Sequence, residues 1–226
     1  MTAGADESGS GRTRNPVRTR AEILKAAREE FCAKGLNGAR VDAIAARAGA
    51  NKRMLYHYFG NKEDLYSAVL LDAYLEIRSG EREMNLSRHS PVEAMEQLVR
   101  FTFRHFLANP WFPRLLAIEN LHNARFLKRI GNLPAINSPL VAGIAEILRR
   151  GSDEGVFRSD VDPVQLYVSI AGLSYFYVSN SRTLSVIFER DFESGAMIEA
   201  REIHAIDVIL SYLTAPPARQ GPADSA

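Results

Sequence analysis

The chain is 226 residues long, with 46% hydrophobic and 24% charged residues, a usage typical of a globular protein that buries one large core or two small ones. Its single cysteine, Cys32, excludes an internal disulfide, and no apolar run approaches the roughly 18 residues needed to span a bilayer. We therefore expect a cytoplasmic protein that does not associate with membranes, in which Cys32 is a small core residue rather than a reactive thiol.

The net charge of +1 conceals a difference between the two parts of the chain. Residues 1–62 contain 12 Lys and Arg against 6 Asp and Glu, a net charge of +6, whereas residues 63–226 contain 16 against 21, a net charge of −5. A basic segment of this kind predicts a surface for a polyanion, although basic N-terminal segments also occur for solubility alone.

Apolar residues recur at helical spacing along most of the chain, which predicts an all-α fold. The composition of the ends predicts a disordered N-terminal arm over residues 1–17 and a disordered, Pro-rich tail over residues 215–226. Between them we expect a helix-turn-helix domain at 18–63 and a larger helical domain at 64–214.

In the first domain, Ile23, Ala27 and Phe31 recur at i, i+4 and i+8, which predicts an amphipathic helix that Gly35 ends. Asn61 is expected to be the N-cap of a later, longer helix, because its amide oxygen can accept an unpaired backbone N–H. The helices expected here cover about 19–34, 41–48, 55–59 and 62–79.

In the second domain, a polar linker at 80–90 is followed by Pro91, a residue well suited to the first position of a helix. The helices expected after it cover about 91–108, 114–130, 140–153, 163–180 and 200–212.

The spacing of small and apolar residues in the first domain is that of a helix-turn-helix. Ile44 and Ala45 lie in a short bracing helix, Gly49 in the turn, and Leu55 in a second helix, although any corner between two helices can show this spacing. In such a motif the second helix presents its first residues to base edges in the major groove of DNA.

The amino-acid sequence around this motif resembles the signature of the TetR family over about Thr19–Leu70. The resemblance includes Tyr56, Tyr58 and Phe59 followed by Asn61-Lys62-Glu63. It implies a three-helix DNA-binding domain, a larger variable helical domain, homodimerisation through the last two long helices, a pseudo-palindromic double-stranded operator, and release from DNA when a small-molecule effector binds. It implies no enzyme activity and no cofactor.

Candidate DNA contacts gather at the start of the second helix, where side-chain donors reach phosphates or guanine edges. Tyr58 and Phe59 are expected to pack inward, and Lys62 is assigned to phosphate by the resemblance. Arg40 and Met54 stand where the family commonly has small hydroxyl residues, so we expect a phosphate ligand at Arg40 and apolar readout at Met54. The residues expected to contact DNA are Arg40, Asn51, Lys52, Arg53, Tyr56, His57 and Lys62.

Upstream of these residues, four arginines either form an arm that follows the DNA backbone or belong to a disordered basic tail. They are Arg12, Arg14, Arg18 and Arg20.

Candidate effector contacts are aromatic and polar residues within apolar helices of the second domain. Glu119 and His122 lie at i and i+3 on one helix face, where they are structural residues, ligand contacts or, least favoured, metal ligands. The segment Tyr175–Asp191 resembles relatives that control operons for aromatic or heterocyclic catabolites, which implies an inducer of that kind. The candidates are His105, Trp111, Glu119, His122, Asn123, Phe126 and Tyr175.

The last helix is more apolar than one packed face requires. Ile203, Ile206, Leu210 and Leu213 are expected to form its stripe, and Val208, Ile209 and Tyr212 to widen it. Small residues within 166–178 would allow a partner helix to approach closely. We therefore expect a homodimer with an interface built from these two helices.

Two other classes of protein compete with the regulator. An enzyme would use Glu119 and His122 as acid and base or as metal ligands, but the chain has no Gly-rich phosphate loop and no nucleophile elbow. A helical adaptor would use the helix-turn-helix for protein contacts and would show no salt-sensitive affinity for DNA.

Overall fold

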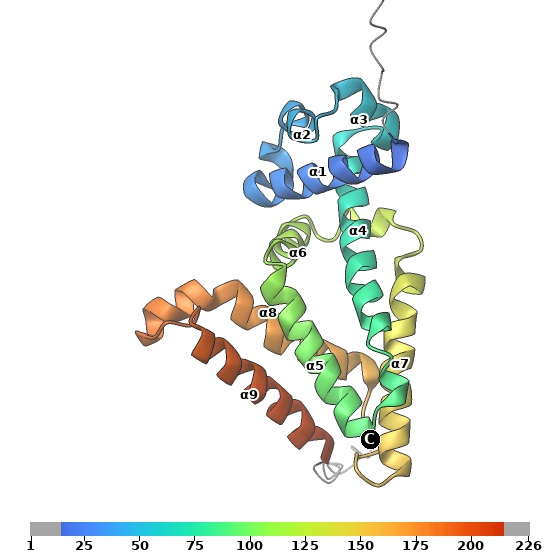
Figure 1. Ribbon diagram of the computed structural model, residues 1–226, viewed down its shortest axis with the longest axis vertical. Coiled ribbons are helices and arrows are strands. Elements are labelled where there is room, and N and C mark those ends of the chain that lie inside the picture. The colour runs from blue at the N-terminus through green and yellow to red at the C-terminus, as the bar shows by residue number, and fades with distance from the viewer. Residues whose placement is uncertain (1–14, 215–226) are drawn as a thin grey trace, which may run out of the picture. The chain divides into compact units, whose positions relative to one another are not determined.

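The computed structural model describes residues 15–214, and these residues form α-helices and short 3₁₀ helices with no strand among them (Figure 1). None of the described helices is long and apolar enough to cross a membrane. The α-helices are α1 (Pro16–Gly38), α2 (Val41–Arg47), α3 (Lys52–Phe59), α4 (Lys62–Glu83), α5 (Pro91–Ala108), α6 (Trp111–Leu121), α7 (Leu133–Asp153), α8 (Pro163–Phe188) and α9 (Gly195–Thr214), and the 3₁₀ helices are η1 (Leu86–Arg88) and η2 (Leu127–Arg129).

The chain divides into an N-terminal unit, Met1–Val69, and a C-terminal unit, Leu70–Ala226. The division lies within α4, whereas the sequence analysis placed it between Glu63 and Asp64. The one helix therefore contributes its first turns to the N-terminal unit and its later turns to the C-terminal unit.

The N-terminal unit is built on the apolar face that the sequence predicts for α1. Ile23, Ala27 and Phe31 are fully buried, and the Phe31 ring meets the Tyr66 ring edge to face at 5.1 Å between centroids. Burying each large apolar side chain contributes about 1.5–3 kcal/mol, so this contact holds α1 against α4. Gly35 has φ 66° and kinks the helix where the sequence analysis ended it.

The expected helix starts are present. Asn61 accepts the backbone N–H of Asp64 at 2.9 Å and so caps α4. Ser90 and Glu93 form a reciprocal capping box at the start of α5, with Pro91 in the first turn. These caps satisfy backbone donors that the first turn of a helix leaves without partners.

The core of the C-terminal unit surrounds α5, which packs against α7, α8 and α9 (Figure 1). Met95 and Leu98 of α5 are fully buried, as are Ile170 of α8 and Leu213 of α9. α4 runs beyond the predicted start of a polar linker, and a Cβ at Gly80 would lie 2.6 Å from the Phe101 ring. Only glycine allows α4 and α5 to approach this closely.

The helix predicted over 114–130 is wrong in its second half. α6 ends at Leu121, because Asn123 and Ala124 both have positive φ and turn the chain. The buried Glu119 carboxylate then accepts the backbone N–H groups of Phe126 and Leu127, which fixes the turn. Of the other helices, α5 has the expected bounds, α2 ends one residue earlier than expected, and the rest are longer than expected.

Candidate functional site

The helix-turn-helix consists of α2, a turn containing Gly49, and α3. Gly49 has φ 59°, a conformation that glycine adopts at little cost, and the Ala50 N–H closes the turn on the Ala45 carbonyl at 2.9 Å. Ile44 and Leu55 are fully buried and lock the two helices together. The predicted bracing helix, turn and second helix are therefore confirmed.

The first turn of α3 is held by contacts within the N-terminal unit. The Asn51 side chain accepts the Met54 N–H at 2.8 Å, so Asn51 is the N-cap of α3 as well as a candidate reader. Lys52 Nζ lies 2.7 Å from an Asp42 carboxylate oxygen of α2, and this hydrogen bond raises the pKa of Lys52. The positive charge of Lys52 thus faces an acidic neighbour.

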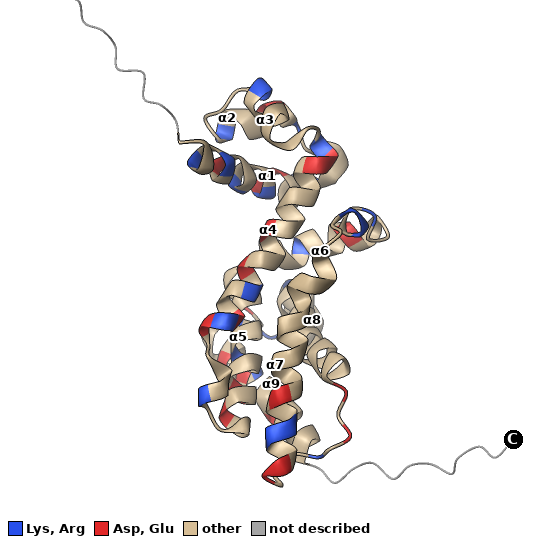
Figure 2. Cartoon of the chain, turned by 90° about the vertical axis from the view of Figure 1, so that its right-hand side faces the viewer, with Lys and Arg blue, Asp and Glu red and all other residues tan. Residues whose placement is uncertain are grey.

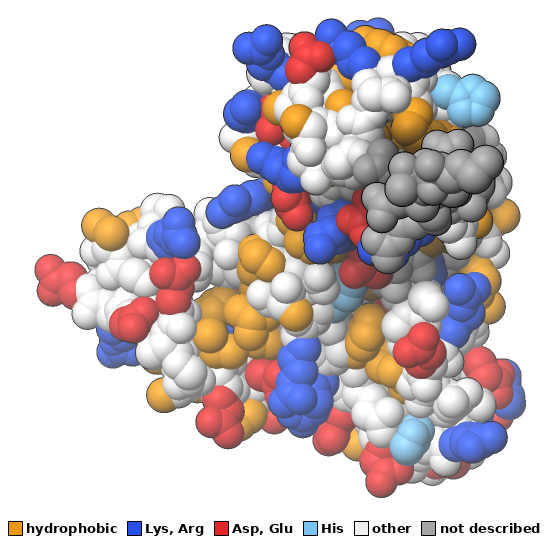
Figure 3. Space-filling view, turned by 45° about the horizontal axis from the view of Figure 1, so that its top comes forward, with side chains coloured by type: hydrophobic (Ala, Val, Ile, Leu, Met, Phe, Trp, Pro, Cys, Tyr) orange, Lys and Arg blue, Asp and Glu red, His pale blue; other side chains and the backbone are white. Residues whose placement is uncertain are grey.

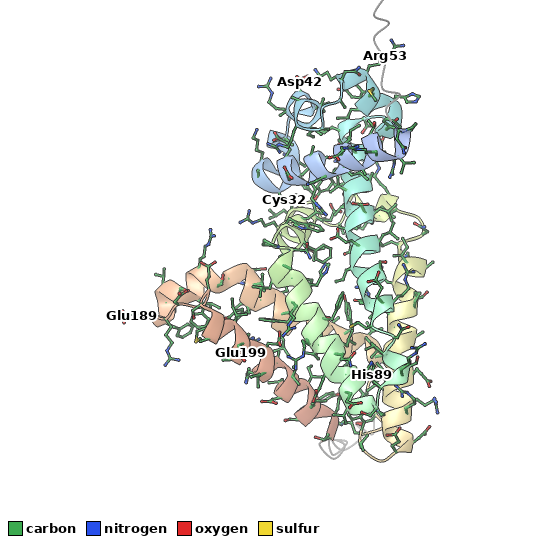
Figure 4. The ribbon with its side chains drawn as sticks, in the orientation of Figure 1. Cys32, Asp42, Arg53, His89, Glu189 and Glu199 are labelled. Carbon is green, nitrogen blue, oxygen red and sulfur yellow. The ribbon has the colours of Figure 1, made fainter. Side chains whose placement is uncertain are left out.

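The remaining candidates on α3 are available to a partner. Arg53 is exposed, points away from the helices around it (Figure 4), and forms no ion pair with another residue of the range 15–214. Tyr56 and His57 are exposed as well, whereas Phe59 is buried and Tyr58 half-buried, as expected. Figure 2 marks Lys and Arg positions along the helices of this unit, and Figure 3 shows Lys and Arg side chains on its surface.

Lys62 and Arg40 lie where helices of the N-terminal unit begin, Lys62 at the start of α4 and Arg40 just before α2. Lys62 Nζ donates to the carbonyl oxygens of Asn37 and Ala39, at 3.4 and 3.1 Å, and so holds the chain that leaves α1. Arg40 is exposed at the N-cap position of α2 and makes no side-chain cap. An ammonium group has three donors, so Lys62 keeps one for a phosphate.

Glu30 is a central residue that the sequence analysis missed. Its carboxylate is 1% exposed, accepts a hydrogen bond from Lys34 at 2.8 Å and the Arg40 N–H at 3.3 Å, and lies 3.7 Å from Arg47. The hydrogen bond from Lys34 holds the pKa of Glu30 below its ordinary value. Because Glu30 follows Ile23 by seven residues, the helical period could have placed it on the buried face.

The predicted basic arm needs a correction. Arg18 and Arg20 lie within α1, and the Arg20 guanidinium stacks over the Phe59 ring at 5.2 Å. They are exposed residues of a helix rather than parts of an extended arm. Arg12 and Arg14 lie outside the described residues.

His105 lies within an aromatic cluster of the C-terminal unit. Its ring is 5.7 Å from Phe101 and 5.8 Å from Phe112 between centroids, and burial lowers the pKa of the imidazole. Its Nε2 atom is buried without a hydrogen-bond partner in the described chain. The Nε2 atom of a neutral His105 can therefore still form one hydrogen bond with a ligand.

The other aromatic candidates are separate from one another. The Trp111 indole donates to Asn109, and Phe126 is buried beneath His122 and Arg125. Tyr175 borders a shallow pocket between α6 and α8. These residues do not line one common cavity.

Glu119 and His122 do not form the expected pair. Glu119 is 1% exposed and faces the turn after α6, where its Oε1 atom accepts two backbone N–H groups, at 2.8 and 2.9 Å. His122 is the C-cap residue of α6 and packs on Phe126, and Asn123 is exposed at the turn. Among residues 15–214, no group of three His, Cys, Asp or Glu could hold a metal ion.

A second group of buried polar residues lies near the end of α4 and was not expected from the sequence. The helix predicted there ended at Ser79, before Glu81. Arg78 and Glu81 of α4 are 4% and 8% exposed, and Arg78 Nη2 donates to the Tyr167 hydroxyl at 2.8 Å. Burial raises the pKa of Glu81 to about 7. Both residues border a cavity of about 280 Å³ between α4, η1, α5 and α7.

The apolar surface of α8 and α9 differs in detail from the predicted stripe. Ile206 and Leu213 are buried in the core of their own unit, and Leu210 packs against that core. Ile203, Val208 and Tyr212 of α9 are exposed, as expected. The exposed apolar side chains of α8 are Val164, Val168, Phe176, Val186, Ile187 and Phe188.

Two family models match this chain. Residues 23–69 match the model described as "Bacterial regulatory proteins, tetR family", and residues 91–209 match "Tetracyclin repressor-like, C-terminal domain".

Named relatives support the same grouping. The transcriptional repressor NicS of Pseudomonas putida is 37% identical over 174 residues, covering 77% of this chain and 82% of that protein. The transcriptional regulator RutR of Escherichia coli K12 is 34% identical over 151 residues, covering 63% of this chain and 69% of that protein.

Solved structures show the same fold. The ketosteroid transcriptional regulator KstR2 of Mycobacterium tuberculosis aligns with a TM-score of 0.61 and 22% identity, covering 91% of this chain and 98% of that one. The regulator FadR of Bacillus subtilis in complex with stearoyl-CoA aligns with a TM-score of 0.63 and 19% identity, covering 85% and 98%.

Proposed function

The chain belongs to the TetR family of bacterial regulatory proteins, and from this membership we propose that it is a repressor that binds operator DNA as a homodimer and leaves it when a small molecule binds. Binding and release require two sites whose occupancies are coupled, and the coupling free energy of allosteric proteins is typically about 1–3 kcal/mol. The protein acts in the cytoplasm, where its DNA is located.

The observation that carries the proposal is the exposed first half of α3 behind the Gly49 turn. Arg53, Tyr56 and His57 read base edges or phosphates in the major groove, because their side chains are exposed on the helix that the motif presents to DNA. Lys52 also contacts DNA once its ion pair with Asp42 breaks. Arg40, Asn51 and Lys62 contact the phosphate backbone, and Asn51 and Lys62 also hold the ends of helices.

Two such helices related by a two-fold axis need a pseudo-palindromic operator. The half-sites are expected about one helical turn apart or somewhat more, roughly 34–36 Å or longer. The two copies meet through the exposed apolar faces of α8 and α9, since a two-fold contact uses the same surface on both subunits.

The effector binds in the C-terminal unit. Of the residues expected from the sequence, we keep His105 as an effector contact because its buried Nε2 has no partner in the described chain. Trp111 and Tyr175 pack against Phe112 and Phe106, which also contact His105. Phe126, Glu119, His122 and Asn123 shape the turn after α6. An aromatic or heterocyclic catabolite remains the inducer that the sequence of α8 favours.

The test is a fluorescence-anisotropy titration of the full chain against its own upstream intergenic DNA and a scrambled duplex of equal length. Specific binding should exceed scrambled binding, and the logarithm of both affinities should fall linearly with the logarithm of the salt concentration. Arg53→Ala should cost about 1–3 kcal/mol on the operator if Arg53 reads guanine, and less on the scrambled duplex. Equal affinity of the parent protein for both duplexes would refute specific recognition.

A further inference from the structure

The cavity beside α4 has a polar wall and an apolar wall. Arg78 and Glu81 form the polar wall together with Arg150 of α7, and Leu98, Ile144 and Ile147 are among the apolar residues opposite. Its volume of about 280 Å³ lies at the small end of ligand sites, so it fits a molecule smaller than a typical drug.

Three guanidinium nitrogens in this wall are buried without hydrogen-bond partners in the described chain. They are Nε and Nη1 of Arg78 and Nε of Arg150. The other nitrogens are engaged, since Arg78 Nη2 binds Tyr167 while Arg150 donates to the carbonyl oxygens of His89 and Leu86. Leaving a charged donor buried and unpaired is costly, so the wall favours a ligand that supplies acceptors.

The charges around the cavity also favour an anion. Three arginines line it, Arg78, Arg82 and Arg150, against two acids. Of the acids, Glu146 is bound by Arg149 at 2.8 Å, and Glu81 is partly protonated at neutral pH because burial raises its pKa to about 7. Glu81 lies 3.1 Å from Arg78, but neither of its carboxylate oxygens makes a hydrogen bond within the described chain.

We propose that this cavity binds a small organic acid, with its carboxylate against the Arg78 guanidinium and its hydrocarbon part against the apolar side chains of α5 and α7. An amine in the same place would meet three guanidinium groups, and a neutral ligand would leave Arg78 with only the partly protonated Glu81 as its counter-charge. The inference rests on the proposed function, because it gives the chemical class of an effector, and the cavity is an alternative to the His105 site, since His105 does not line it.

The experiment is calorimetric titration of the full-length protein with benzoate and hexanoate, each beside its neutral amide, and with benzylamine. Concentrations reach about 10 mM, where a ligand with a Kd of about 1 mM would saturate the site. At least one acid should bind at least tenfold more tightly than its amide, and benzylamine should not bind. Absence of binding by both acids, or equal binding of acid and amide, would overturn the proposal.

Two variants place the site. Arg78→Met should weaken binding of the acid at least tenfold, whereas Arg190→Met, which alters an exposed arginine outside the cavity, should not change it. Gly143→Leu tests the cavity independently of the Arg78 network, because a Cβ at Gly143 meets no atom within 4 Å and the added side chain would fill the space. Circular dichroism checks that each variant folds.

Unchanged binding of the acid in both Arg78→Met and Gly143→Leu would place the site elsewhere. Operator affinity of the parent protein, measured without acid, separates the two proposals. Specific DNA binding without acid binding refutes only this inference, and acid binding without specific DNA binding refutes only the proposed function.

Discussion

In the proposed DNA complex, the pairing of Lys52 with Asp42 lowers the affinity of α3 for DNA. The two side chains are exposed and 2.7 Å apart, so Lys52 must leave a carboxylate before it can neutralise a phosphate. The carboxylate itself would also face the negatively charged backbone, and a like charge there lowers affinity for every DNA sequence.

Replacing Asp42 by Asn should therefore raise DNA affinity, by roughly three- to tenfold at low salt, for both operator and scrambled duplexes. The measurement is fluorescence anisotropy at several salt concentrations. Glu22→Gln on the exposed side of α1 is the matched control, because it removes the same charge away from Lys52. An equal increase in the control would show that net charge alone is responsible.

Glu30 illustrates a second effect at the scale of the residue, the pH dependence of stability. Its pKa is lowered in the folded state, mainly by the hydrogen bond from Lys34. A carboxyl group with a lowered folded pKa stabilises the fold above its unfolded pKa of about 4.3, and the contribution is lost as the pH falls through the folded pKa.

Glu30→Gln should lower the free energy of unfolding by about 1–3 kcal/mol at pH 7, because the ammonium and guanidinium partners lose their charged acceptor. The loss should shrink at an acidic pH below about 4.3, because the parent protein loses the Glu30 charge as the pH falls through its lowered pKa. Urea titrations at both pH values measure the loss. Glu29→Gln is the control, because Glu29 is half exposed and comes no closer to Arg47 than 3.7 Å. A loss of equal size at both pH values would contradict the role of the charge.

At the scale of the element, the turn after α6 depends on one buried carboxylate. Two backbone N–H groups that a continued helix would have paired internally are satisfied by Glu119 instead. The positive φ values at Asn123 and Ala124 are unfavourable for residues other than glycine, so the turn needs this compensation.

Glu119→Ala should leave the N–H groups of Phe126 and Leu127 unpaired, at a cost of about 1–3 kcal/mol. Hydrogen–deuterium exchange should become faster at these two amides, and the melting temperature should fall. Asn120→Ala, which removes an exposed side chain bound to the Leu116 carbonyl, is the control. Unchanged exchange at Phe126 and Leu127 would remove Glu119 from this structural role.

At the scale of the whole molecule, the exposed apolar side chains of α8 and α9 define the surface for a second copy. Phe176 is 58% exposed and Ile203 51% exposed, and large exposed apolar patches mark interaction surfaces. A stable interface of standard size buries about 800 Å² on each partner, which two long helices can supply.

Ile203→Arg should convert the dimer to a monomer, because a charge would be transferred into a desolvated contact. Sedimentation velocity at several protein concentrations measures the change. Leu121→Arg, at an exposed residue at the end of α6, should leave the dimer intact. Ile203 is a better choice than Leu210, which packs against the core of its own subunit.

The sequence by itself determined the features that depend on local interactions. The apolar period of α1, the caps at Asn61 and Ser90 and the Gly49 turn each involve residues within one or two helical turns, so their pattern survives in the linear chain. The position of the helix-turn-helix and the all-α class followed from them.

The tertiary structure alone decided which polar residues lie inside and what they contact. Arg78 approaches Tyr167 across 89 positions of sequence, and Glu30 accepts the N–H of Arg40. Helical periodicity assigns a residue to a face, but only packing determines which neighbour covers that face, and therefore whether a charge is solvated, paired or available to a ligand. The proposed effector cavity follows from packing for this reason, whereas the helix-turn-helix could be located from the sequence.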